Sequence, residues 1–476
     1  PNHCCLKYAG SDRPPGIFPG LTRAPTMSPR RRELRTLTGL AVPLVLTHLG
    51  SMLMGAVDTA MVGRLNDAPI LAAAALANVW ISGTSLAAMG ILFGLDPVVT
   101  QAHGAGKGEQ AGRALQGGLV IAILLGLFIS ALWTRTESVL LTFGQDPELA
   151  RMAGRYARVQ AFSVVPFLLF TALRQYLQGR GILAPALWVT AIANIFNALL
   201  NWALIFGHLG LPAMGLQGAG VASGLTRAFM FAALAVMVWR ARLYRGAWSP
   251  WSMKALHPDS WGPTLRFGAP VCLHLSLEIW AFSYSTLMAG KLGAIATAAH
   301  SVVMNVASLT FMIPLGISAA AVTRVGNLIG ARRHDDAQRA SWVAMGMGAG
   351  VMACCGLTIF LLRDSLPGIY TGQQEVLRTC ALILPIAAAF QIFDGTQVVG
   401  SGILRGMGRT LPAAGLNLVG YWALALPLAH WMAFKRGMGL PGIWWGLAVA
   451  LAVVALGMTA CVHFLGPARD RRRVID

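Results

Sequence analysis

Charged side chains are scarce in this chain. Asp, Glu, Lys and Arg make up 12% of its 476 residues, against roughly 25% in soluble domains. Hydrophobic residues make up 56%, and the mean hydropathy is +0.62. This composition excludes an ordinary soluble domain and predicts a polytopic protein that lies in a lipid bilayer.

Acidic residues are the scarcer of the two charge types, with 18 Asp and Glu against 37 Lys and Arg. The bases fall in short groups between long apolar runs and do not form one basic face, so we expect no nucleic-acid partner. Short basic groups of this kind are typical of topology signals beside membrane spans.

Catalytic motifs are absent as well. The sequence contains no H-E-x-x-H, no G-x-S-x-G and no Walker loop, so intramembrane hydrolysis and direct use of ATP have no basis in it. The histidines lack metal-ligand spacing, and five of the seven cysteines fall in or beside apolar segments, which does not fit an extracellular disulfide framework. We expect no enzyme, no catalytic metal centre and no disulfide.

Long apolar segments of about 20 residues, the length that crosses a bilayer, are plentiful. Twelve of them begin near Leu37, Ile70, Leu115, Tyr156, Pro185, Gly218, Leu265, Ala296, Ala340, Arg378, Leu411 and Gly442. With the N-terminus inside, most Lys and Arg groups fall on one side, which predicts that both termini are cytoplasmic.

The two halves of the chain resemble each other at a fixed offset of 227 residues. The matching pairs near the start of each half are Pro43 with Pro270, Thr59 with Thr286, Met61 with Met288, Gly63 with Gly290, Leu65 with Leu292 and Asn78 with Asn305. Those further along are Gly179 with Gly406, Gly181 with Gly408 and Pro185 with Pro412. Because Gly and Pro positions repeat as well as aliphatic ones, we interpret the pattern as a duplication and not as chance apolar similarity.

The fold class follows from the spans and the repeat. We predict an all-α polytopic membrane protein with twelve transmembrane helices in two six-helix lobes related by pseudo-two-fold symmetry. The expected parts are a disordered N-terminal tail (1–31), the first lobe (32–240), a cytoplasmic inter-lobe loop (241–263), the second lobe (264–466) and a basic C-terminal tail (467–476).

Two acids fall inside predicted spans of the second half. Asp394 has Gln391 and Gln397 three residues away on either side, and Glu278 has His274 four residues before it. An acid at the centre of a span costs about 2.5–3.5 kcal/mol on insertion scales. Two carboxylates in one lobe repel each other unless a proton or a small hard cation such as Na+ lies between them, so we predict a coupling-ion or substrate site.

A third intramembrane acid, Asp58, lies in the first half. The fifth span carries Asn194, Asn197 and Asn201 at spacings of three and four, which places them on one helical face. We predict a polar site of Asp58, Asn197 and Asn201, with the alternative that the asparagines only link helices. For each acid the corresponding alternative is that its carboxylate only makes a polar contact with a neighbouring helix.

Four segments in order resemble the multidrug and toxic compound extrusion (MATE) transporters, in particular their bacterial NorM-like branch. They are "VDTAMVGRL" with Asp58, "NALLNWALIFG" with Asn197 and Asn201, "LEIWAFSYSTLMAGKLG" with Glu278, and "FQIFDGTQVVGSGILRGMGR" with Asp394. The similarity runs from about Arg32 to Gly466. At Phe390 the chain departs from relatives that carry a Tyr one turn before the acid.

The resemblance implies an antiporter that exports organic, often cationic, compounds in exchange for Na+ or H+ by alternating access. Glu278 and Asp394 match the family's second-lobe cation site, where Na+ could bind. We expect a monomer in a bacterial inner membrane, with no cofactor besides the coupling ion. The alternatives are a flippase for lipid-linked sugars, which would need a more basic cavity, and a scaffold or receptor that does not transport.

Overall fold

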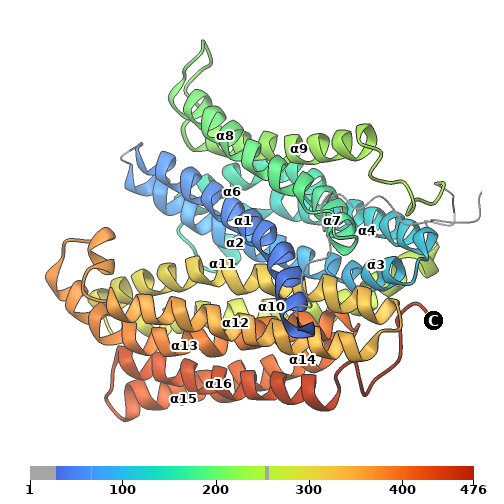
Figure 1. The fold of residues 1–476 in the computed structure, drawn as a ribbon. Coiled ribbons are helices and arrows are strands. Elements are labelled where there is room, and N and C mark those ends of the chain that lie inside the picture. The colour runs from blue at the N-terminus through green and yellow to red at the C-terminus, as the bar shows by residue number, and fades with distance from the viewer. Residues whose placement is uncertain (1–27, 66, 252, 254–256) are drawn as a thin grey trace, which may run out of the picture.

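The computed structural model describes residues 28–65, 67–251, 253 and 257–476. Within these ranges the chain forms helices and no strand (Figure 1). The predicted all-α fold is therefore confirmed. The disorder expected for the N-terminal tail stays a prediction for residues 1–27, because they lie outside the described ranges. The first helix begins at Pro29, inside the segment that was assigned to the tail.

The first half contributes α1 (Pro29–Gly63), α2 (Ala68–Leu92), α3 (Leu95–Gly104), α4 (Gly108–Thr134), α5 (Thr136–Thr142), α6 (Pro147–Gln160), α7 (Val164–Gly179), α8 (Ala184–Phe206) and α9 (Gly215–Arg240). The second half contributes α10 (Pro258–Gly290), α11 (Ala294–Gly330), α12 (His334–Leu361), α13 (Gln374–Gly406), α14 (Thr410–Asn417), α15 (Leu426–His430) and α16 (Leu440–Phe464). Short 3-10 turns lie at Ala161–Ser163 and Leu366–Ile369, and π-helical turns at Leu418–Ala425 and Trp431–Lys435.

Eleven helical segments of the described chain are long and apolar enough to cross a membrane. The twelfth predicted span corresponds to α10, whose 33 residues extend about 50 Å at 1.5 Å per residue. This helix is not among the eleven, and Arg266, His274 and Glu278 lie along it. It is thus also a helix that carries a predicted site residue.

The two halves meet along their inner helices. In Figure 1, α1 and α2 face α10 and α11 in the middle of the molecule, while α8 and α9 lie on one outer side and α15 and α16 on the other. One apolar core lies in each half. A third core joins Leu37, Ala41 and Leu44 of α1 to Ile317 and Val325 of α11, so the halves share apolar contacts.

Polar contacts between the halves gather at one end of the bundle. We call it the basic end and define it by Glu33 of α1, Gln101 of α3, Arg324 of α11, Arg405 of α13 and the C-terminal segment 466–476. There Gln101 donates a hydrogen bond from Nε2 to the Gly406 carbonyl at 3.1 Å. The Val474 amide donates to Gln101 Oε1 at 2.7 Å.

A break in the second span allows the halves to approach closely. Between α2 and α3, a Cβ atom on Gly94 would lie 2.0 Å from the Thr264 carbonyl oxygen of α10. A Cβ atom on Gly268 of α10 would lie 2.0 Å from the Ile91 carbonyl oxygen. Both positions require glycine because backbone meets backbone, and the contact anchors α10 against the first half.

We predict that Gly94→Val lowers the free energy of unfolding by about 1–3 kcal/mol, because the added side chain overfills a closed contact. The measurement is the thermal unfolding midpoint of the purified protein in detergent. Gly83→Ala in α2 is the control, since no heavy atom lies within 4 Å of its added Cβ. Equal midpoints for Gly94→Val and the wild type would contradict this account of the break.

Candidate functional site

The structure brings the three predicted polar residues of the first half together. Asn201 of α8 donates a hydrogen bond from Nδ2 to Asp58 Oδ1 of α1 at 2.5 Å and lies 3.2 Å from Asn197 Oδ1. Ser223 of α9 donates from Oγ to the other carboxylate oxygen of Asp58 at 2.7 Å. Both asparagines are buried. Asp58 therefore joins three helices, and each of its oxygens accepts a hydrogen bond.

A half-buried arginine of the same half adds positive charge near Asp58. Arg227 of α9, four residues after Ser223, lies within electrostatic range of Asp58 and of Tyr156. Its guanidinium lies 5.1 Å from the Phe167 ring centroid. Ser223 and Arg227 were not predicted from the sequence, although an arginine inside a predicted span is itself a signal. The negative charge of Asp58 is thus opposed within its own half.

The second half buries both of its predicted acids. Glu278 of α10 is 6% exposed and Asp394 of α13 is 3% exposed, and the two carboxylates interact electrostatically. His274 Nε2 lies 3.5 Å from Glu278 Oε2. Asn417 of α14 links this pair to α13, because its Nδ2 lies 3.4 Å from His274 Nε2 and its Oδ1 accepts a hydrogen bond from Gln397 at 3.3 Å.

The glutamines on either side of Asp394 are buried and incompletely bonded. Gln391 Oε1 accepts a hydrogen bond from Thr310 of α11 at 3.2 Å, while its Nε2 has no hydrogen-bond partner among the residues that the structure describes. Gln397 Oε1 also lacks a partner. The polar stripe predicted along α13 therefore packs inside protein, with Gln397 offering a free acceptor one turn from Asp394.

A tyrosine that the sequence analysis missed lies beside both acids. Tyr421 is fully buried in the π-helical turn Leu418–Ala425, and its hydroxyl interacts with Glu278 and Asp394 without an aligned hydrogen bond. The Phe282 ring contacts both Tyr421 and Phe390, with centroid separations of 5.7 and 6.2 Å. A phenolic hydroxyl thus comes from a different helix than Phe390, in a π-turn of the kind frequent at functional sites.

The two halves differ in how their acids are compensated. Asp58 has two aligned donors and a nearby arginine, whereas Glu278 and Asp394 lie within electrostatic range of each other, with His274 beside Glu278. Among the described residues no group of three His, Cys, Asp or Glu side chains is placed to hold a metal ion. A cation here would need hydroxyl or amide oxygens in addition to the two carboxylates.

An all-helical bundle of two sequence-related halves, with buried acids inside its spans, defines a polytopic membrane protein of the transporter class. The MatE family model matches the chain twice, over residues 43–203 and 270–431, and the chain belongs to this family of transporters, which are not enzymes. The two matches begin at positions that also correspond in the internal repeat, Pro43 and Pro270.

Relatives and solved structures cover nearly the whole chain. A probable multidrug resistance protein NorM from Mesorhizobium japonicum is 34% identical over 439 residues, which are 89% of this chain and 92% of the relative. An uncharacterized transporter from Schizosaccharomyces pombe is 35% identical, over 90% of this chain and 79% of the relative.

The crystal structure of the eukaryotic MATE transporter AtDTX14 matches with a TM-score of 0.86 and 25% identity, over 94% of this chain and 99% of that one. The Vibrio cholerae MATE transporter VcmN in its bent form matches with a TM-score of 0.81 and 18% identity, over 93% and 98%. The predicted twelve-helix fold and family are confirmed.

We predict that Asn201→Ala lowers the free energy of unfolding by about 1–3 kcal/mol, because it removes a donor from a buried carboxylate. Thermal unfolding in detergent measures the effect. Asn194→Ala is the matched control on α8, since Asn194 donates only to the Thr190 carbonyl of its own helix, at 2.9 Å. The cost of Asn201→Ala should shrink in an Asp58→Asn background, and an equal cost in both backgrounds would contradict the assigned contact.

Proposed function

We propose that the protein is a secondary antiporter that exports organic, mostly cationic, drugs or toxic compounds in exchange for Na+ or H+. The observation that carries this proposal is the buried pair Glu278 and Asp394. Among the described residues, no arginine or lysine is hydrogen-bonded to either carboxylate. The name of the Mesorhizobium relative, a multidrug resistance protein, supports the class of cargo. Paired acids disfavour a pyrophosphate-linked lipid.

The coupling ion fits the chemistry of the second-half site. Glu278 and Asp394 supply carboxylates, Tyr421 a hydroxyl, and Gln397 an amide oxygen with no partner. Such a set of oxygen donors suits a small hard cation such as Na+, and a single proton shared by the acids would also relieve their repulsion. His274 and Gln391 would position this set, and Asp58, Asn197 and Asn201 would form a polar site in the first half.

Exchange follows from competition for one negative site. If a cationic drug and the coupling ion neutralise the same two carboxylates, each weakens the binding of the other by the same factor. A tenfold proton gradient supplies about 1.4 kcal/mol. A net charge that crosses 100 mV supplies about 2.3 kcal/mol. Alternating access of the site to the two sides would convert this free energy into a drug gradient.

Orientation is part of the same proposal. The basic end contains Arg324, Arg333, Arg405, Arg409 and the arginines near the C-terminus. The positive-inside rule assigns such an end to the cytoplasm. Both termini would then be cytoplasmic, in a bacterial inner membrane. A monomer is sufficient for this mechanism because each chain contains both halves.

We predict that Asp394→Asn and Glu278→Gln each reduce export to the level of cells without the transporter. Insertion should be retained, because removing a charge lowers the cost of placing the helix in the bilayer. The assay is ethidium efflux from a pump-deficient strain at matched membrane expression. Glu375→Gln is the control, since Glu375 is an exposed acid in the first turn of α13. Wild-type efflux by either site variant would refute the site.

We predict that equilibrium binding of a fluorescent organic cation to the purified protein weakens as Na+ rises, or as pH falls from about 8 to 5. The reason is that Na+ or protons compete for the same carboxylates. Fluorescence anisotropy measures the binding, and Asp394→Asn should flatten whichever dependence the wild type shows. Wild-type binding that is indifferent to both ions would rule out direct competition at this pair.

A further inference from the structure

Another buried acid pairs with an arginine of the opposite half. Asp96 of α3 is 1% exposed, and its Oδ2 lies 3.2 Å from Nε of Arg405 on α13. Its other oxygen accepts a hydrogen bond from Gln175 at 2.8 Å. The Arg405 guanidinium also lies 4.9 Å from the Phe93 ring centroid. The contact therefore fixes an arginine of the second half against the first half.

This ion pair can separate at a small cost in stability. Within the described part of the chain, neither Asp96 Oδ2 nor Arg405 Nε makes an aligned hydrogen bond. A buried ion pair without full hydrogen bonding gains little stability over its desolvation cost. Arg174 of α7 lies within electrostatic range of Asp96. If the halves part at this end, Asp96 keeps a cation of its own half, whereas Arg405 loses its acid.

Arg405 and the second-half acid site share a small cavity. The cavity has a volume of about 40 Å³ and is lined by His274, Glu278, Ser318, Ser401 and Arg405 among others. A water molecule needs about 10–15 Å³ by this measure, so the space is large enough for water. The positive guanidinium thus lines the same cavity as the Glu278 carboxylate.

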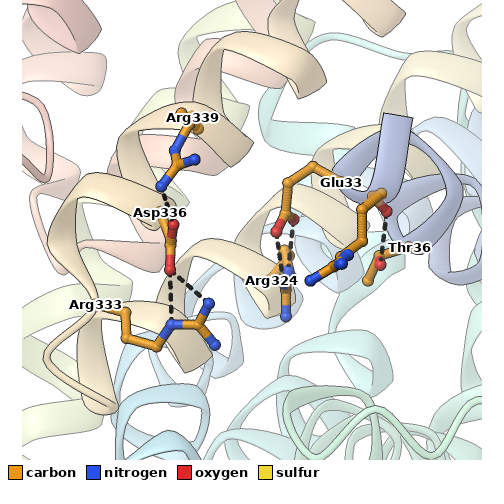
Figure 2. A network of polar contacts seen from close by, with 7 residues as sticks. Glu33, Thr36, Arg324, Arg333, Asp336 and Arg339 are labelled. Carbon is orange, nitrogen blue, oxygen red and sulfur yellow. Dashed lines mark hydrogen bonds and ion pairs between the residues drawn. The ribbon is translucent and has the colours of Figure 1, made fainter. Parts of the chain in front are cut away.

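Around this ion pair the basic end is closed, because the backbones of the two halves are in contact there. A Cβ atom on Gly104 of α3 would lie 2.0 Å from the Asn327 carbonyl oxygen of α11, and one on Gly330 would lie 2.1 Å from the Gln101 carbonyl oxygen. Glu33 of α1 accepts two hydrogen bonds from Arg324 of α11, at 2.9 and 2.7 Å (Figure 2). No cargo can pass between backbones in such contact.

We propose that Arg405 is a gate residue for the coupling cation. In this closed arrangement Asp96 fixes its guanidinium at the basic-end side of the Glu278 cavity, where its positive charge excludes a cation. Separation of the halves removes Asp96 and lets Arg405 leave that position, which opens the path to the site. We call the contact between Asp96 and Arg405 the latch, and the inference that it holds the halves together rests on geometry alone. The identity of the gated ion as the coupling cation rests on the proposed function.

Two readouts without any drug test the proposal. The first is the distance between spin labels at Glu109→Cys and Ala331→Cys, exposed positions in opposite halves at the basic end, with the seven native cysteines replaced by alanine. Asp96→Asn and Arg405→Gln should each shift the equilibrium toward longer distances by roughly 5- to 150-fold, the usual range of coupling between sites. Unchanged distances in both variants would overturn the latch.

The second readout is leak of radioactive Na+, and of protons followed by a trapped pH dye, into proteoliposomes. Arg405→Gln should leak faster than the wild type. Glu33→Gln is the matched control because it breaks another ion pair between the halves but leaves the cavity charge intact. It should lengthen the distances but leak more slowly than Arg405→Gln, because the Arg405 guanidinium still occupies the cavity whenever the halves are closed. Leak of Arg405→Gln equal to that of Glu33→Gln would overturn the gate.

The effects of misfolding and of lost drug export can be distinguished from these outcomes. If a single variant aggregates, the double variant Asp96→Asn with Arg405→Gln removes both charges of the pair and is measured by the same two readouts. Arg339→Gln, which breaks an exposed ion pair with Asp336 within α12, should change neither readout. Lost ethidium export in Asp394→Asn bears on the proposed function, whereas distances and drug-free leak bear on the latch and the gate.

Discussion

Burial of carboxylates inside membrane spans is the constraint on which the rest of this structure depends. Each such acid must be compensated by donors, by a cation or by neutralisation, and the chain uses a different solution for each. Asp58 accepts aligned hydrogen bonds from Asn201 and Ser223. Asp96 faces Arg405 of the other half. Glu278 and Asp394 lie within electrostatic range of each other, and the proposed cation or proton would relieve their repulsion.

The helical architecture was predictable because length and apolarity mark a membrane span strongly. All twelve expected spans coincide with helical segments, and the asparagines of α8 share one face as their spacing predicted. Ser223, Arg227 and Tyr421 were missed because tertiary packing, not spacing along one helix, brings them to the acids. Tyr421 also lies in a π-helical turn, which changes the direction of side chains relative to a regular α-helix.

Asp96 was missed for a different reason. It lies between Gly94 and Pro97, and such a sequence is typical of a turn at the end of a span. In the structure this segment is the break between α2 and α3, in the middle of the second span. The glycine that suggests a turn serves instead as a backbone contact with α10. The same local signal therefore marks an inter-half contact, which sequence periodicity alone does not distinguish from a loop.

Asymmetry between the repeated halves explains how an ion could bias the whole molecule. At the repeat offset of 227, Asp58 corresponds to Ser285, Glu278 to Ser51 and Asp394 to Phe167, so the acids are not duplicated. The second-half site lies on α10 and α13, and both of these helices also contact the first half, through Gly268 and through Arg405. A cation that draws Glu278 and Asp394 together acts on both helices at once. Two rigid elements with shared contacts at the site and at the interface supply a physical route for coupling, and no longer chain of residues is needed.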